Sequence, residues 1–156
     1  MSKNSPGNFF EDFRIGQVIR HATPRTLTSG DVALYIGLFG PRFAVQSSDA
    51  FAKAIGYPRA PIDDLLVFHI VFGKSVPDVS LNAVANLGYA NCCFRKPVYP
   101  GDTLYPMLEV SALTAQRSTG VVTLAATVHN QKGELVLTGE QKILLRKRGS
   151  AVSEAR

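Results

Sequence analysis

This chain of 156 residues has few cysteines and no long apolar segment. Its two cysteines, Cys92 and Cys93, are adjacent, and neighbouring side chains of a strand point to opposite faces, so a disulfide between them is not expected. We interpret them as reduced packing residues of a cytoplasmic protein. A catalytic thiol is the less favoured alternative, because no charged group flanks the pair. The longest apolar run, residues 65–72, is too short to cross a membrane, and residues 1–10 lack the apolar region of a signal peptide.

The charge of the chain is unbalanced, but its distribution is not typical of a nucleic-acid-binding protein. The net charge is +5, and much of the excess lies in one run, residues 146–148. A wide basic face interleaved with aromatic residues is missing, so we expect a small acidic ligand and no nucleic acid. The spacings of a metal site, a P-loop, a GxGxxG turn and a GxSxG elbow are also missing.

The composition is that of one globular domain. Hydrophobic residues make up 46% of the chain and charged residues 19%, which excludes a largely disordered protein. The length fits a single domain. We predict that this domain covers residues 9–148, between a flexible N-terminus (1–8) and a flexible C-terminal tail (149–156), because both ends are polar and rich in small residues.

Hydrophobic periodicity and turn residues predict one strand, three helices and then an antiparallel meander. The expected strands cover residues 17–27, 83–94, 103–113, 120–129 and 134–145, and the expected helices cover residues 32–39, 50–55 and 62–76. This order predicts an α+β fold in which a curved sheet covers the third helix.

The third helix is apolar on nearly all sides. One stripe at helical spacing contains Ile62, Leu65, Leu66, His69, Ile70 and Gly73. The remaining surface also carries apolar residues, namely Val67, Phe68, Val71 and Phe72. We therefore expect the helix to be buried in its domain, with His69 on a stripe that faces the core.

Three motifs resemble those of the MaoC-like dehydratase family of hot-dog proteins. Residues 94–104, FRKPVYPGDTL, resemble its F-x-x-P-V-x-P-G-D-T-L strand–turn–strand. Residues 9–17, FFEDFRIGQ, resemble its opening F-E-D-F-x-x-G, and residues 27–32, LTSGDV, resemble its T-x-x-D-V helix start. The likeness covers residues 9–148 and is greatest for the branch that hydrates mesaconyl-CoA, whose runs LLVFHIVFGK and ANLGYA recur here.

The resemblance implies a hot-dog fold, in which a long central helix is wrapped by a bent antiparallel sheet. It also implies an acyl-CoA substrate and reversible addition of water across the double bond of a short, branched enoyl-CoA. No cofactor other than the coenzyme A of the substrate, and no metal, is implied. The family usually dimerises and binds its substrate at a subunit or half-to-half interface, so we expect a homodimer or a hetero-oligomer with a second hot-dog chain. Exposed sheet edges favour the same pairing.

The loop that follows the first helix lacks the usual acid–base pair. Active family members carry Gly-Asp there, with a His five residues after the Asp, and these two side chains hold the water and move its proton. In this chain Gly40 matches the Gly, whereas Pro41 occupies the Asp position and Gln46 the His position. Proline cannot exchange a proton, and glutamine can orient a water but is not a base at neutral pH.

Two explanations of this loss are open. The mesaconyl-CoA branch normally joins two hot-dog halves in one chain, and this sequence resembles the first half, so a partner could supply the dyad. Alternatively, Asp63, Asp64 and His69 do the chemistry, because a carboxylate at an apolar helix entry has a raised pKa. The competing structural roles are first-turn acids that favour the helix dipole and a core or interface histidine. His69 lies five or six residues beyond the acids, so it does not share their helix face.

Further residues are candidates for substrate binding. Arg42 is suited to the free carboxylate of a dicarboxylic substrate, although a surface charge is the alternative. Gln46 and Ser47 lie on the same loop. Backbone N–H groups between Ile62 and Leu65 are expected to stabilise the thioester oxygen.

A second group of candidates lies on or beyond the later strands. Asn86, Gly88 and Tyr89 are expected on a strand beside the central helix, where Gly88 either admits a ligand or bends the sheet. Three basic side chains are candidate contacts for the CoA phosphates or, alternatively, solvated strand ends: Arg95, Lys96 and Arg146.

Two other functions remain open on the sequence. A non-catalytic subunit that binds a CoA ligand for a partner chain would explain the missing dyad directly. A hot-dog acyl-CoA thioesterase would use Asp63 or Asp64 to activate water. The three cases differ in product. A hydratase forms a hydroxyacyl-CoA, a thioesterase releases free CoA, and a non-catalytic subunit forms neither.

Overall fold

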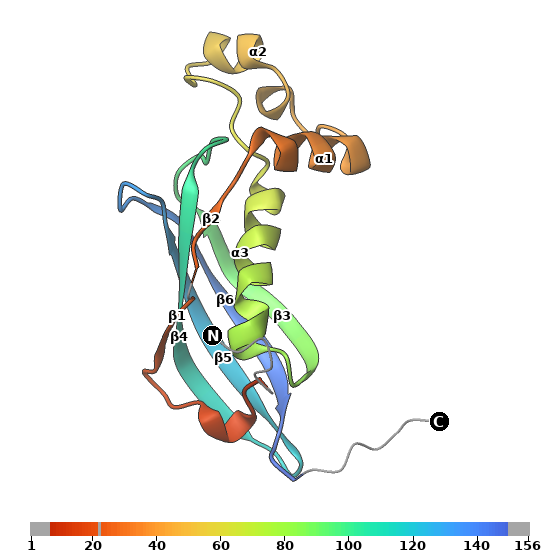
Figure 1. Ribbon diagram of the computed structural model, residues 1–156, viewed down its shortest axis with the longest axis vertical. Helices are drawn as coiled ribbons and strands as arrows, with labels where there is room; N and C mark the ends of the chain where they lie inside the picture. Colours follow the sequence, from red (N-terminus) through yellow and green to blue (C-terminus); the bar gives the residue numbers. More distant parts are fainter. Residues whose placement is uncertain (1–6, 22, 150–156) are drawn as a thin grey trace.

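The computed structural model describes residues 7–21 and 23–149 and confirms the predicted α+β organisation. Its longest helix, α3 (Asp64–Val79), lies along the inner face of an antiparallel sheet that curves around it (Figure 1). The strand order in the sheet is β1-β4-β5-β6-β3, and the short strand β2 also pairs with β4. The sheet is built from β1 (Val18–Arg20), β2 (Arg25–Thr26), β3 (Ala83–Phe94), β4 (Thr103–Ala115), β5 (Thr119–His129) and β6 (Leu135–Arg146).

The core lies between α3 and the inner face of the sheet. Alternate residues of β5 point inward, and Val122, Leu124 and Val128 are fully buried. On α3 the buried side chains are Val67, Val71, Phe72, Ser75 and Val79. Burial of one aliphatic side chain contributes roughly 1.5–3 kcal/mol, so this contact is the main source of stability of the fold.

The expected core-facing stripe of α3 is wrong in part: Ile62, Leu66 and Ile70 pack in or against the core, but the other three residues do not. Leu65 is 39% exposed and Val76 is 41% exposed, and both His69 and Gly73 are exposed in this chain. The valines at positions 67, 71 and 79 face the sheet instead. Since both faces of the helix are apolar, periodicity alone could not decide between them. One apolar face of α3 is therefore left uncovered by the described part of the chain.

The predicted strand 17–27 is broken into β1 and β2. Arg20 pairs with Met107, and Arg25 pairs with Leu104. More residues therefore separate Arg20 from Arg25 than separate Leu104 from Met107 on the partner strand. Pro106 of β4 has no N–H to donate to a neighbouring strand, and the edge chain leaves β4 at this point.

Two helices and a loop extend beyond one end of the sheet (Figure 1). Helix α1 (Ser29–Phe39) starts with a capping box, in which the Asp31 N–H donates to Thr28 Oγ1 and the Thr28 N–H donates to the Asp31 carboxylate. Helix α2 (Asp49–Ala54) is capped by Ser48. Two 3₁₀ turns complete the elements, η1 (Phe10–Asp12) and η2 (Ala44–Gln46).

The predicted tails lie mostly outside the described residues. Asn8, assigned to the N-terminal tail, is held in place because its Nδ2 donates to the Asp78 carbonyl oxygen at 2.6 Å. None of the helices in the described ranges is long and apolar enough to cross a membrane.

Candidate functional site

An ion pair fixes the loop after α1 onto the start of α3. Arg42 Nε and Nη2 donate to the two carboxylate oxygens of Asp63, each at 2.8 Å. Asp63 is the N-cap of α3, and its Oδ1 also accepts the Leu65 N–H at 2.8 Å. Because the carboxylate is buried and the pairing is bidentate, the loop and the helix start are held as one unit.

Because Arg42 and Asp63 bind each other, neither side chain is free to bind a substrate. Burial alone raises the pKa of Asp63, but the hydrogen bonds from Arg42 and from the Leu65 N–H outweigh it and hold the pKa below the usual 3.8. The raised pKa expected for this carboxylate is therefore wrong. Arg42, expected to receive a substrate carboxylate, already has one as its partner.

Beside this ion pair lies a cavity of about 290 Å³ between the loop, the entry to α3 and the segment after β3. Asp64 is the acidic residue that lines it. Burial raises the pKa of the Asp64 carboxyl, and the adjacent charge of Asp63 raises it further, against an opposing effect of Arg42. The lining residues are Phe43, Val45, Gln46, Tyr57, Pro61, Ile62, Asp64, Phe94, Arg95, Lys96 and Pro97.

Gln46 contributes an unusual polar group to this cavity. Its residue is only 8% exposed, and its Oε1 has no hydrogen-bond partner among the described residues. Gln46 also borders a small neighbouring cavity together with Pro41 and Asp63. An unpaired buried oxygen costs about 1–3 kcal/mol, and this one belongs to a residue that borders two cavities.

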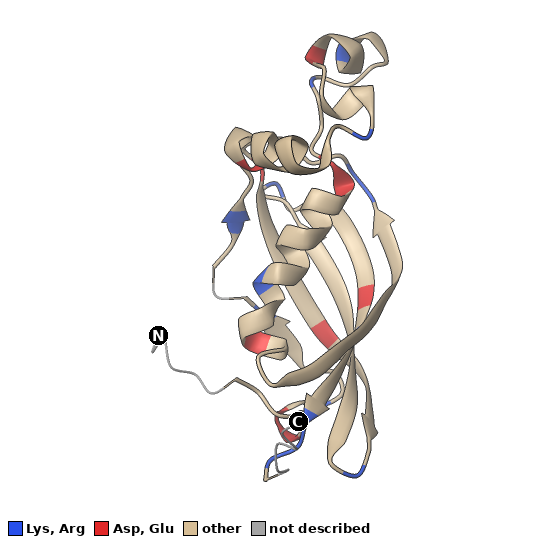
Figure 2. Cartoon of the chain, turned by 90° about the vertical axis from the view of Figure 1, so that its right-hand side faces the viewer, with Lys and Arg blue, Asp and Glu red and all other residues tan. Residues whose placement is uncertain are grey.

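The three expected phosphate contacts do not lie together. Arg95 and Lys96 follow β3 and line the loop cavity. Arg146 is the last residue of β6 and lies beside the start of β3, where Ala83 pairs with Leu145. Arg95 and Lys96 follow the other end of β3, so the whole strand separates them from Arg146. Lys96 Nζ binds Glu134 at 2.7 Å, whereas the Arg95 side chain has no such partner in the described ranges. Figure 2 shows the basic residues spread over the molecule.

His69 lies at a different place from the two acids. It lines a second cavity of about 290 Å³ between the exposed face of α3 and β3, together with Asn86 and Tyr89. The Tyr89 ring lies 4.6–4.7 Å from the rings of Phe68 and Phe72. The expected catalytic set of Asp63, Asp64 and His69 is therefore not brought together, whereas Asn86 and Tyr89 are.

Gly88 and Ser47 contribute no wall to either cavity. Gly88 has a φ of 151° and lies at a shift in the β3–β6 register, which supports its role in bending the strand. A Cβ built on Gly88 would meet no atom within 4 Å. Ser47 is exposed, and its Oγ lies 3.5 Å from the Ala44 carbonyl oxygen.

Two of the backbone donors expected for the thioester oxygen, those of Ile62 and Leu65, are already occupied. The Ile62 N–H donates to the Val98 carbonyl at 2.8 Å, and the Leu65 N–H donates to Asp63. This structure thus leaves neither group free to bind an oxyanion, although the Ile62 residue does line the loop cavity.

Sequence reasoning missed three aromatic residues of the loop cavity, Phe43, Tyr57 and Phe94. Phe94 stands first in the FRKPVYPGDTL motif, so the motif itself was a usable signal. Tyr57 follows Gly56 in a turn and has no periodic pattern around it, so its place depends on tertiary structure.

Comparison with known proteins places this geometry in a family. The MaoC like domain matches residues 11–132. The chain is 58% identical over 149 residues to the beta-methylmalyl-CoA dehydratase of Chloroflexus aurantiacus, covering 94% of this chain and 42% of the relative. It is 50% identical over 151 residues to the mesaconyl-CoA hydratase of Cereibacter sphaeroides, covering 96% of this chain and 44% of the relative. The chain thus spans less than half the length of these curated relatives.

Solved structures give the same result for the fold. A putative MaoC domain protein dehydratase from Chloroflexus aurantiacus aligns with a TM-score of 0.90 at 57% identity, covering 95% of this chain and 43% of that one. A conserved hypothetical protein from Mycobacterium tuberculosis, described as a double hot-dog fold, aligns with a TM-score of 0.85 at 28% identity, covering 93% of this chain and 46% of that one. The α3 helix inside a curved sheet is therefore a hot-dog fold, and the chain belongs to the MaoC-like domain family.

Proposed function

We propose that this chain is a hydratase unit that reversibly adds water across the double bond of a short, branched, mesaconyl-like enoyl-CoA. The observation that carries the proposal is the high identity to two relatives named for this chemistry, over nearly the whole chain. The loop cavity supports it, because a carboxyl with a raised pKa and an unpaired amide oxygen line the same cavity.

Asp64 and Gln46 have complementary roles in this proposal. The Gln46 Oε1 accepts a hydrogen bond from the attacking water and orients it. The Asp64 carboxylate takes a proton from that water while the water oxygen bonds to the β-carbon of the substrate. Asp64, now a carboxylic acid, then gives this proton to the α-carbon. The raised pKa of Asp64 makes its carboxyl easier to protonate, which suits a group that must alternate between these two states.

Arg95 is the proposed receptor for a free carboxylate of the substrate. It lines the loop cavity, and within the described ranges its side chain makes no ion pair, whereas Arg42 is held by Asp63. Lys96, on the same wall but paired with Glu134, is proposed to contact a CoA phosphate. No metal or separate cofactor enters this proposal.

A second hot-dog unit completes the molecule in this proposal, either as another copy of this chain or as a different chain. Strand β3 is an edge of the sheet and carries exposed apolar side chains, with Val84 and Leu87 each 52% exposed. The uncovered apolar face of α3 lies beside it. Edges and apolar faces of this kind favour pairing. We also propose a cytoplasmic location, consistent with the two free cysteines.

The alternative is a subunit that binds the CoA ligand but needs a partner for proton transfer. Pro41 and Gln46 favour it, because neither can replace the acid–base dyad of active family members. A thioesterase is the remaining enzyme alternative, in which Asp64 would direct water to the thioester carbon.

The test is to incubate the purified chain with mesaconyl-CoA, following the enoyl-thioester absorbance and the product mass. Gain of one water, abolished by Asp64→Asn and retained by Glu109→Gln, is the expected result; Glu109 is an exposed carboxylate on β4 outside the cavity. Release of free CoA would establish the thioesterase instead. Bound but unchanged ligand would establish the binding subunit, and light scattering of the same sample tests the predicted pairing.

A further inference from the structure

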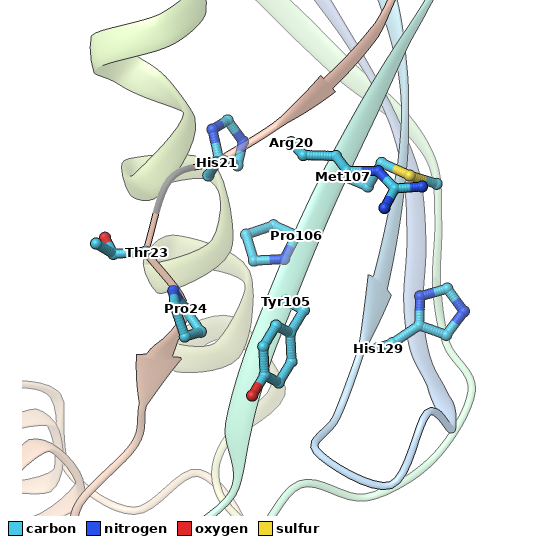
Figure 3. A pocket seen from close by; sticks show the side chains of 8 residues that line it. All are labelled: Arg20, His21, Thr23, Pro24, Tyr105, Pro106, Met107 and His129. Atoms are coloured by element: carbon cyan, nitrogen blue, oxygen red, sulfur yellow. The ribbon is translucent and has the colours of Figure 1, made fainter.

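A separate cavity of about 390 Å³ opens at the β1–β4 edge of the sheet (Figure 3). It is lined by Arg20, His21, Thr23, Pro24, Tyr105, Pro106, Met107 and His129. Its size falls within the roughly 300–1,000 Å³ of small-molecule sites. The proposed hydratase chemistry uses none of these residues.

The cavity is a product of the broken edge strand. Pro106 cannot donate a hydrogen bond, and His21, Thr23 and Pro24 have no strand pairing with β4 beside it. Pro24 and Pro106 then supply a rigid apolar part of the lining, and Figure 3 shows their rings near each other. A gap with such walls does not close by a side-chain rotation, because both rings are fixed to the backbone.

The outer wall of the cavity gathers basic and aromatic side chains on one face of the sheet. Arg20 pairs with Met107 and His129 pairs with Tyr105, and alternation places all four on the face away from α3. Within the described ranges, Arg20 and His129 have no hydrogen bond or ion pair to another side chain. The ionisable lining residues other than Tyr105 are all basic, and none is acidic.

The inner wall is formed by His21, whose buried ring is paired with the partly exposed Asp78. The His21 side chain is 2% exposed, and its Nδ1–H donates to Asp78 Oδ2 at 2.6 Å. With Nδ1 engaged, Nε2 is the remaining polar atom of the ring, and it has no partner in the described part of the chain. A buried ring nitrogen without a partner, in a residue that lines a cavity, leaves a hydrogen bond that the described residues do not satisfy.

We propose that this cavity is a second binding site, specific for a small organic anion with an apolar body. Arg20 and His129 bind the carboxylate or phosphate group through charge-assisted hydrogen bonds. Tyr105, Met107 and the two prolines contact the apolar part. The Nε2 of His21 meets a polar group at the inner end, with its ring held in orientation by Asp78.

This site is distinct from the loop cavity. Asp64 stands at the start of α3 and Asp78 near its end, 14 residues later, which corresponds to roughly 21 Å along the helix axis. The two cavities share no lining residue. The second site can therefore be occupied while an acyl-CoA is bound, and its occupancy is measurable without any enzyme assay.

The three histidines of the chain provide the measurement. We would follow their imidazole signals by NMR while titrating the full chain with benzoate and, separately, with inorganic phosphate. His21 and His129 line the site and His69 does not, so saturable shifts of the first two with a stationary His69 are expected. If benzoate alone saturates the site, its ligand is an organic carboxylate. If both anions saturate it, the site also accepts ligands that carry a phosphate group.

Two matched variants complete the test. Arg20→Gln is expected to weaken binding about 10-fold, which corresponds to the loss of one charge-assisted contact. Arg14→Gln makes the same charge change at an exposed position outside the cavity and should leave the affinity unchanged. His129→Gln is expected to weaken binding without unfolding the chain. Absence of saturation by either anion, equal shifts of all three imidazoles, or an Arg20→Gln variant with unchanged affinity would overturn the proposal.

Discussion

Replacing Gln46 by methionine should make the chain more stable and less able to bind its substrate. The two side chains are similar in length and volume, so the packing is retained. The change removes an amide whose Oε1 is buried without a partner, a situation that costs about 1–3 kcal/mol. Allowing for the lost hydration of the rest of the amide, we expect the free energy of unfolding to rise by about 1 kcal/mol. For a chain of this size that is an increase in Tm of about 2–4 °C.

The matched control is Gln17→Met. Gln17 is partly buried, but its Oε1 accepts the Arg14 N–H at 3.0 Å, so the same substitution removes a satisfied bond and should destabilise the fold by about 0.5–1.5 kcal/mol. Urea unfolding monitored by circular dichroism gives both free energies, and mesaconyl-CoA binding is measured on the same samples. If Gln46→Met destabilises the chain as Gln17→Met does, the amide is paired in the free protein and the assignment of Gln46 to a ligand-binding role fails.

Three further predictions concern charge and packing. The pKa of Asp64 is higher in the folded chain than in the unfolded chain. Its contribution to stability is therefore full below the pKa of the unfolded chain and is lost as the pH rises through the pKa of the folded chain. Asp64→Asn should melt at a higher temperature than the natural chain at pH 7 and at the same temperature at low pH. The lowered pKa of Asp63 has the opposite sign, so Asp63→Asn, which keeps an N-cap but loses the Arg42 pair, should melt lower at pH 7, with the difference fading as pH falls below about 4; an equal difference at both pH values would contradict this. A Cβ on Gly120 would clash with the Phe10 ring, so Gly120→Ala should cost about 1–3 kcal/mol by urea unfolding, and an unchanged midpoint would show that the ring moves aside freely.

Most of the fold could be predicted from the sequence because its signals are local. The bounds of β3 match the predicted residues 83–94, and the other three long strands differ by at most two residues at each end. Alternation and turn residues specify these strands directly. The face of α3 could not be predicted in the same way, since Val71 and His69 both lie on apolar faces and only the position of the sheet separates them.

The site was predictable in its location but not in its pairings. Gln46 was identified as the residue at the His position of the loop and Asp64 as a carboxylate at the helix entry, and both line one cavity. The bond between Arg42 and Asp63 joins residues 21 positions apart, and no local pattern indicates it. The break between β1 and β2 depends on Pro106 of a strand far along the chain, so its effect appears only once the register is known.

The sheet order also determines when each strand can form. Strand β3 is paired only with β6 in the described sheet, although β4 and β5 follow it in the chain. About 50 residues must be synthesised between the end of β3 at Phe94 and the end of β6 at Arg146, which takes about 3–10 s at ~5–20 residues per second. During that interval the apolar β3 has no hydrogen-bonding partner from its own chain, and the β4–β5 hairpin can form without it. A chain that ends before β6 therefore loses two strands of the sheet and leaves β3 exposed to aggregation.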